Sequence, residues 1–414
     1  MEQPAFLPST LWVLPFAALL LGIAVIPLAA PHFWESNARK LVVSAVLGVP
    51  VLMLYAVHAP FAIAHTAADY LSFMVLLGSL FVISGGVLIE GDLVATPTVN
   101  TAFLAGGALL ASFIGTTGAS MLLIRPLLET NSERRSAVHT VVFFIFLVSN
   151  IGGCLTPLGD PPLFLGYLQG VPFTWTFRLA PAWLFTSGVL LGIYFVWDTV
   201  MHQSEPAPWV RADRTHVVPL SLRGAENLVL LGGIVAAAAF LGSPWREGTM
   251  VALTIISFRR TPKAVHAANR FSFHPIVEVA VIFLGIFATM IPALDLLRVR
   301  GAELRIHEPW QFFWATGVLS SFLDNAPTYL TFLALAQGRG LAPEVVQVPH
   351  AILAAISLGA VFMGANSYIG NGPNFMVRSI AEGRGVRMPS FGGYMLYSGC
   401  VLLPVFSLVT WVFF

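Results

Sequence analysis

The stretch TPLGDPPLF at residues 156–164 aligns without gaps to SYIGNGPNF at residues 367–375, an offset of 211 residues (367 − 156). Upstream, LASFIGTTGASMLLI at 110–124 aligns to LSSFLDNAPTYLTFL at 319–333, an offset of 209 residues (319 − 110). Two independent alignments at nearly the same offset are hard to obtain by chance. They predict that the chain contains two related halves.

The composition predicts a membrane protein. Hydrophobic residues make up 57% of the 414 residues and charged residues only 10%, whereas a soluble domain carries about a quarter charged residues. The net charge of +1 offers no basic face to nucleic acid. The two cysteines, Cys154 and Cys400, lie in apolar stretches and form no metal-ligand cluster.

A helix needs about 20 apolar residues to cross the bilayer. Ten stretches are predicted to do so: 11–30, 41–58, 70–89, 138–168, 182–200, 225–241, 247–258, 275–297, 350–377 and 391–414. Two other apolar stretches, 99–128 and 309–337, are broken at the middle by polar or turn-forming residues. This pattern is typical of a re-entrant hairpin, which enters and leaves the membrane on one side.

Each half would therefore hold five spans and one hairpin, and an odd number of spans inverts the second half. The predicted fold is an all-α polytopic membrane protein with two inverted repeats, 1–200 and 225–414, joined by a cytoplasmic linker at 201–224. If the N-terminus is outside, fourteen Lys and Arg residues fall inside and six outside. Because Lys and Arg favour cytoplasmic loops, both termini are predicted to lie outside.

Four breaks interrupt the predicted helices: GTTGAS (115–120), TPLGDPP (156–162), DNAPTY (324–329) and GANSYIGNGPN (364–374). Gly and Pro interrupt a helix, and such backbone is tolerated at membrane depth only where protein buries it or a watery cavity meets it. The freed carbonyls can bind a cation, and the freed amides an anion. We therefore expect two hairpin tips and two broken helices to form one central site.

Asp160 and Asp324 are the strongest candidates for the chemistry. A carboxylate near the bilayer middle is costly and by default functional. Burial favours its protonated form and a bound cation its ionised form, so one carboxylate can exchange H⁺ for Na⁺. The alternative is that each Asp only caps a half-helix. Further candidate ligands are amides and hydroxyls that could instead satisfy broken backbone: Asn150, Asn366, Asn371, Asn374, Thr116, Thr117, Ser120 and Ser367.

Other polar residues are expected to have structural roles or to contact solvent. Glu90 and Asp92 end a predicted span and are expected to be solvated. Glu278 lies near the start of a span and is a candidate to pair with a cation. His139 opens a span, where an interfacial or capping role outweighs proton transfer.

Three stretches resemble the ion transporter superfamily: SNIGGCLTPLGDPPLFLGYLQGVPF (149–173), SSFLDNAPTYLTF (320–332) and GANSYIGNGPNFMVRSIAEGRGVRMPSF (364–391). They are most similar to bacterial Na⁺/H⁺ antiporters of the NhaD and NhaE kind and to citrate-transporter-like proteins. The resemblance implies inverted repeats, a dimerising scaffold and a transport unit that moves as an elevator in the bacterial inner membrane.

The resemblance also implies an ion site in which Asp160 acts with Thr156 and Asn150, and Asp324 with Asn325 and Thr328. One motif departs from it. The first tip reads GTTGAS, where many relatives carry an Asp-Asn or Ser-Asn pair, so a symmetric pair of cation sites is not implied.

Na⁺/H⁺ exchange is the leading functional hypothesis, because no Arg or Lys is predicted at the broken-helix cores. Coupled uptake of an organic anion such as citrate is the alternative, and a wide, amide-lined central cavity would favour it. An intramembrane enzyme is disfavoured, since HEPWQ (307–311) lacks the second His of HExxH and no G-x-S-x-G occurs. The expected partners are the lipid bilayer, Na⁺, H⁺ and a second copy of the chain, with no resident cofactor.

Overall fold

The computed structural model describes residues 6–206, 208–209, 213, 215, 218–340 and 343–414. It is 76% helical. Among the described residues, seven helices are long and apolar enough to cross a membrane, and shorter apolar helices accompany them. The prediction of an all-α polytopic membrane protein is therefore confirmed. Several positions of the predicted linker, Arg211 and Arg214 among them, lie outside the described residues.

The chain before the linker forms three long helices, a helical hairpin, an interrupted helix and a final long helix. These elements are η1 (Thr10–Val13), α1 (Leu14–Ala29), α2 (Pro31–Trp34), α3 (Asn37–His58), α4 (Pro60–Ser84), β1 (Leu88–Glu90), α5 (Pro97–Ile114), α6 (Thr116–Thr130), α7 (Val138–Leu147), η2 (Ile151–Cys154), α8 (Pro161–Leu168), η3 (Phe173–Leu179) and α9 (Ala180–Gln203).

From residue 221 onward the elements are a strand, three main helices with a short helix among them, a helical hairpin, an interrupted helix and a final long helix. They are β2 (Ser221–Arg223), α11 (Glu226–Phe240), α12 (Trp245–Arg260), α13 (Lys263–Ala268), α14 (His274–Arg300), η4 (Gly301–Glu303), α15 (Pro309–Ser320), α16 (Asn325–Gly338), α17 (His350–Met363), η5 (Gly364–Asn366), α18 (Gly372–Gly383) and α19 (Phe391–Phe413).

Helix α4 differs most from its prediction. It begins at Pro60, ten residues before the predicted start, and ends at Ser84. The polar side chains of His65 and Asp69 lower the hydropathy of its first turns, but the alanine-rich backbone there still favours a helix. Beyond α4, strand β1 pairs antiparallel with β2. Residues just before β2 lie against the loop that follows β1, and the Asp92 N–H donates to the Val218 carbonyl at 2.9 Å. Asp92 is therefore only 6% exposed, and the expectation that it is solvated was wrong.

The breaks fall where glycine and proline predicted them. Helices α5 and α6 are separated by Gly115 alone, whose φ of +82° is left-handed and suits glycine. Helix α7 ends at Leu147, and after η2 the chain resumes as α8 with Pro161 in its first turn. Helix α17 and η5 are followed in the same way by α18.

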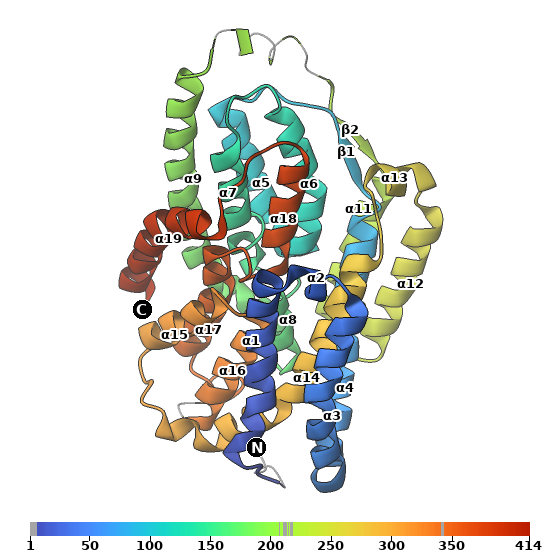
Figure 1. Cartoon of the computed structure of the whole chain (residues 1–414), viewed down its shortest axis with the longest axis vertical. Coiled ribbons are helices and arrows are strands. Elements are labelled where there is room, and N and C mark those ends of the chain that lie inside the picture. The colour runs from blue at the N-terminus through green and yellow to red at the C-terminus, as the bar shows by residue number, and fades with distance from the viewer. Residues whose placement is uncertain (1–5, 207, 210–212, 214, 216–217, 341–342) are drawn as a thin grey trace.

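The long helices α4 and α14 contact each other and connect the two halves of the molecule. Helix α4 packs against α11 and α12, whereas α14 packs against α1 and α3. In Figure 1, α6 and α18 extend from the centre toward the β1–β2 end, and α8 and α16 extend the opposite way. The molecular centre is thus the place where all four of these helices begin.

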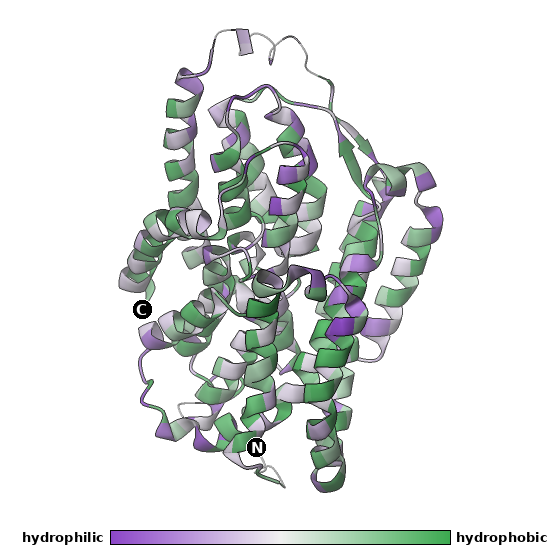
Figure 2. Ribbon diagram, viewed as in Figure 1, coloured by the Kyte–Doolittle hydropathy of each residue, from purple (hydrophilic) through white to green (hydrophobic). Residues whose placement is uncertain are grey.

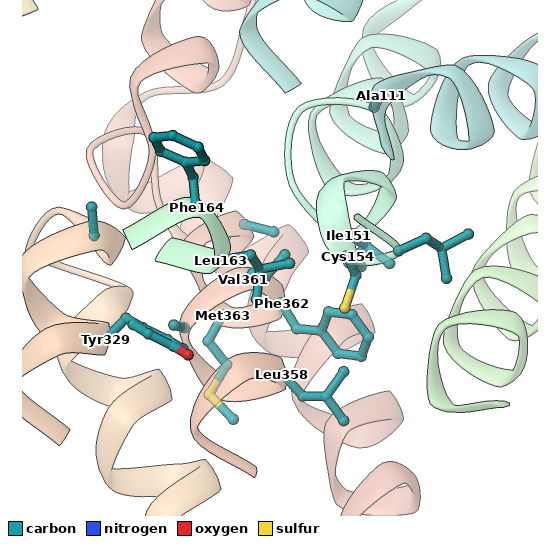
Figure 3. Close-up of a cluster of buried hydrophobic side chains, with 14 of the residues drawn as sticks. Ala111, Ile151, Cys154, Leu163, Phe164, Tyr329, Leu358, Val361, Phe362 and Met363 are labelled. Atoms are coloured by element: carbon teal, nitrogen blue, oxygen red, sulfur yellow. The ribbon is translucent and has the colours of Figure 1, made fainter. Parts of the chain in front are cut away.

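Apolar side chains form both the core and much of the surface. Figure 3 shows part of the core, in which Leu163 of α8, Tyr329 of α16 and Val361 of α17 pack together. On the outside, large apolar side chains such as Phe61 and Trp411 are 88% and 84% exposed. In Figure 2, hydrophobic residues, coloured green, occur along most helices. Such a surface suits lipid, whose core offers no partner for polar groups.

Candidate ion-binding site

Asp160 lies where the breaks of both halves meet. It precedes α8 in an extended conformation and is 1% exposed. Its Oδ1 accepts hydrogen bonds from Thr116 Oγ1 at 2.7 Å and Asn371 Nδ2 at 3.1 Å. Its Oδ2 accepts one from Asn325 Nδ2 at 2.6 Å. One carboxylate therefore joins the first hairpin tip, the second hairpin tip and the second broken helix.

The surroundings of Asp160 stabilise negative charge without a basic side chain. Helices α6, α8, α16 and α18 all begin at residues that contact or adjoin this carboxylate. A helix N-terminus carries roughly half a positive charge, which favours an anion there. Within the described part of the chain, no Lys, Arg or His forms an ion pair with Asp160. The carboxylate is thus held only by neutral donors and helix dipoles.

Two buried amides hold the second broken helix together. Asn374 donates to the carbonyls of Gly364 and Ser367, both at 2.9 Å, and accepts from Asn150 Nδ2 at 2.7 Å. Asn150 also donates to the Ile145 carbonyl at 2.7 Å. These bonds satisfy backbone freed by the breaks, which is the structural role considered for both residues. Among the residues that the structure describes, the buried Oδ1 atom of Asn150 nevertheless has no hydrogen-bond partner.

The same hydroxyl arrangement occurs in both halves. Thr156 Oγ1 donates to the Ser112 carbonyl and accepts from the Leu158 amide at 3.2 Å. Ser367 Oγ donates to the Ser321 carbonyl and accepts from the Ile369 amide at 3.2 Å. In each half, this hydroxyl ties the broken helix to the first arm of the neighbouring hairpin. Thr156 and Ser367 thus position the site and do not reach the Asp160 carboxylate.

The remaining predicted residues are spread around this centre. Asp324 caps α16 by accepting from the Ala326 amide at 3.0 Å, and Thr328 Oγ1 donates to the Asp324 carbonyl at 2.8 Å. Ser120 and Ser149 share a hydroxyl contact of 2.8 Å. Thr117 lines the cavity beside Asp160. Asp324 therefore lies at the second hairpin tip, next in the chain to Asn325, whose amide contacts Asp160.

The cavity at Asp160 is small and mostly apolar. Its volume is about 80 Å³, and its walls include Leu80 of α4, Val279 of α14 and the first hairpin tip. Pockets that hold drug-sized ligands span roughly 300–1,000 Å³. The cavity therefore suits a small ion with little water and lacks the wide, amide-lined form expected for an organic anion.

A protein-family model matches the chain over nearly its whole length. The model of the CitMHS_2 family, whose description reads "Putative citrate transport", matches residues 6–414. The chain belongs to this family. The resemblance to the ion transporter superfamily is thereby confirmed, and family membership supports a multi-pass secondary transporter. No curated protein sequence matches the chain.

In this member of the citrate-transport family, the sequence prediction missed one buried polar cluster. Asp198 of α9 is fully buried and accepts from Arg134 Nη2 at 2.8 Å, with His139 Nε2 also at 2.8 Å. Asn100 Nδ2 donates to it at 3.3 Å. The cluster ties α9 to the distal ends of α5, α6 and α7. An Asp inside a predicted span was the available signal, and His139 is buried within the protein.

The expected partner of Glu278 is present. Its Oε1 lies 2.5 Å from Lys40 Nζ, which joins α3 to α14. This ion pair lies away from Asp160, in the helices that surround the hairpins and broken helices.

Proposed function

We propose that this protein exchanges Na⁺ for H⁺ across the bacterial inner membrane, with Asp160 as the group that binds either ion. The observation that carries the proposal is a buried carboxylate at the meeting point of four breaks, with no basic partner among the described residues. A buried charge without an opposite charge is strongly disfavoured, so a proton or a cation must neutralise it. Because one carboxylate cannot hold both ions, binding of one releases the other.

We also infer that residues 1–200 and 225–414 are inverted repeats. The repeated order of elements supports this inference, as do the matching Thr156 and Ser367 hydroxyl bonds. Asp160 and Asn371, which align in sequence, precede their helices with nearly the same backbone angles: φ −144° and ψ 143° against φ −151° and ψ 142°. Inverted repeats around a central site suit alternating access.

The proposed transport unit consists of the two hairpins and two broken helices, which move as an elevator against a scaffold. The scaffold would contain α4 and α14 with the helices packed on them, and would form the homodimer. The excess of Lys and Arg in the predicted inner segments supports termini on the outside.

Coupled uptake of citrate or a similar organic anion is the second candidate. The family description favours it. The convergence of four helix N-termini also favours it, because their amides and dipoles can hold a carboxylate. The narrow apolar cavity at Asp160 favours the smaller ion.

Proton flux in proteoliposomes that contain a pH-sensitive dye distinguishes these functions. Sodium, lithium or potassium is added outside, with wild-type protein beside Glu303→Gln, a matched change of an exposed carboxylate at the end of η4. A sodium-dependent pH change in both proteins is the expected result. No response from folded protein, together with uptake of radiolabelled citrate, would replace the exchange proposal by the organic-anion candidate.

A further inference from the structure

A second cavity lies at the end of the molecule opposite the β1–β2 pair, toward which α8 and α16 extend (Figure 1). We call it the far cavity, and the cavity at Asp160 the ion-site cavity. The volume of the far cavity is about 420 Å³, and its lining includes charged and amide side chains: Asp69, Gln169, Arg298 and Gln337. A cavity of this size with such polar groups is roomy enough for water. The residues between the two cavities therefore decide whether water and ions pass from one to the other.

Helix α4 lines both cavities. Asp69 lines the far cavity and Leu76 lines the ion-site cavity, roughly 10 Å apart along the helix at about 1.5 Å per residue. Phe73 lies between them in the same helix. The segment at α8 has a similar order, because Phe164 lines the ion-site cavity and Gln169, one residue beyond the helix, lines the far cavity. Both segments thus place a phenylalanine along the passage from one cavity to the other.

Helix α14 has the same order with two phenylalanines. Val279 lines the ion-site cavity and Met290 lines the far cavity. Phe283 and Phe287 lie between them, about one helical turn apart. Three separate segments of the chain therefore bring aromatic rings to the region between the two cavities.

The four rings pack together, and we call them the aromatic barrier. The ring centroid of Phe73 lies 4.8 Å from that of Phe283, 5.8 Å from that of Phe287 and 6.5 Å from that of Phe164. All four side chains are at most 5% exposed. An ion that entered such an apolar constriction would lose its water without gaining ligands, which is strongly unfavourable.

Polar contacts hold the end of α8 against the neighbouring helices. Gln169 Nε2 donates to Asp69 Oδ2 at 3.0 Å, and Arg298 Nη2 donates to Gln169 Oε1 at 3.2 Å. Tyr167 Oη donates to the Ala238 carbonyl at 3.0 Å. These bonds connect α8 to α4, α14 and α11. They keep α8 in the position in which its phenylalanine completes the aromatic barrier.

We propose that the aromatic barrier closes the ion site off from the far cavity and thereby keeps sodium movement coupled to proton movement. Phe73, Phe283 and Phe287 belong to helices of the proposed scaffold, whereas Phe164 belongs to the proposed transport unit. Movement of α8 along the scaffold would carry its ring away from the other three and open the barrier. The inference rests on the proposed exchange for the claim that the barrier protects coupling.

Sodium accumulation in proteoliposomes under a fixed pH gradient tests the barrier. Phe73→Ala should keep an initial rate of exchange close to wild type, because Asp160 and its donors are unchanged. It should lose most of the sodium gradient reached at steady state, because sodium leaks back past the missing ring. Phe287→Ala removes another ring of the barrier and should lose the gradient in the same way.

Two control variants separate a leak from general damage to the core. Phe406→Ala removes a fully buried ring of α19 that packs against Phe313 and Phe362, which line neither cavity, and should keep the wild-type gradient. Phe73→Leu keeps a large apolar side chain at the barrier and should retain most of the gradient. Thermal unfolding of each variant establishes that it is folded.

Several results would overturn the proposal. A wild-type sodium gradient in folded Phe73→Ala and Phe287→Ala would show that these rings close no passage. An equal loss in Phe406→Ala would show that removal of any buried ring has this effect. If the wild type moves no sodium in response to a pH gradient, the exchange proposal fails, and passive efflux of radiolabelled sodium at equal pH then tests the barrier. Greater efflux from Phe73→Ala than from wild type would support the barrier, and equal efflux would refute it.

Discussion

Replacing Asp160 by asparagine keeps the shape of the side chain and removes its charge. Thr116 can still donate to the amide oxygen, but the new amide group would face the Nδ2 donor of Asn325, now 2.6 Å from Oδ2. Rotation of the Asn325 amide relieves this contact, so we expect the protein to remain folded. The substitution should instead weaken the binding of the cation. At about 4 Å and an effective dielectric constant of about 20, one unit charge contributes roughly 4 kcal/mol, or about a thousandfold in sodium affinity.

Sodium binding by calorimetry and sodium-driven proton flux in proteoliposomes measure this loss. Asp160→Asn should bind sodium about a thousandfold more weakly and move no protons in response to it, because the carboxylate proposed to exchange H⁺ for Na⁺ is gone. Glu303→Gln, which changes an exposed carboxylate, should behave as wild type. Sodium-driven proton flux retained by folded Asp160→Asn would refute the assignment of Asp160 as the shared site.

Three other variants test neighbouring parts of the structure. Asp324→Asn should leave stability unchanged, because Asn and Asp cap helices equally well, and should weaken sodium affinity several-fold through loss of a nearby charge; unchanged affinity would leave Asp324 as a helix cap only. Asn374→Ala removes three buried hydrogen bonds and should destabilise the protein by about 3 kcal/mol or more in denaturant unfolding, whereas the exposed amide variant Gln203→Ala should not. Burial, followed by the charges of Glu133, Asp213 and Glu129, raises the pKa of the Asp92 carboxyl. The stability gained from protonated Asp92 is therefore complete below the ordinary carboxyl range and lost as pH rises through the raised value. Asp92→Asn should accordingly melt above wild type at about pH 8 and equally at about pH 4; a constant difference between these pH values would contradict this reasoning.

The breaks could be predicted because their causes are local. Gly115 alone permits the left-handed turn between α5 and α6, and Pro161 begins α8 after the extended Asp160. Each break depends on a few neighbouring residues in the sequence. The alignment of the two halves also marks the corresponding break in each half. The choice of Asp160 as a central candidate followed from its charge in an apolar span.

The partners of Asp160 could not be derived in this way. Asn325 and Asn371 lie 165 and 211 residues away, and which side chain meets which depends on how the halves pack. The same reason hid the Asp198 cluster, in which Arg134 approaches from the turn after α6 and His139 from α7. Asp92 was misjudged because linker residues just before β2 lie against its loop, where the Asp92 N–H donates to the Val218 carbonyl at 2.9 Å.

The separation of Asp160 from its partners also affects how the protein is made. Of its three donors, only Thr116 precedes it in the chain. At about 5–20 residues per second, the ribosome needs roughly 10–40 s more to reach Asn371. During that interval the nascent first half must keep a carboxylate at membrane depth without two of its donors. A proton on Asp160 during this interval would remove its charge until the second half supplies Asn325 and Asn371.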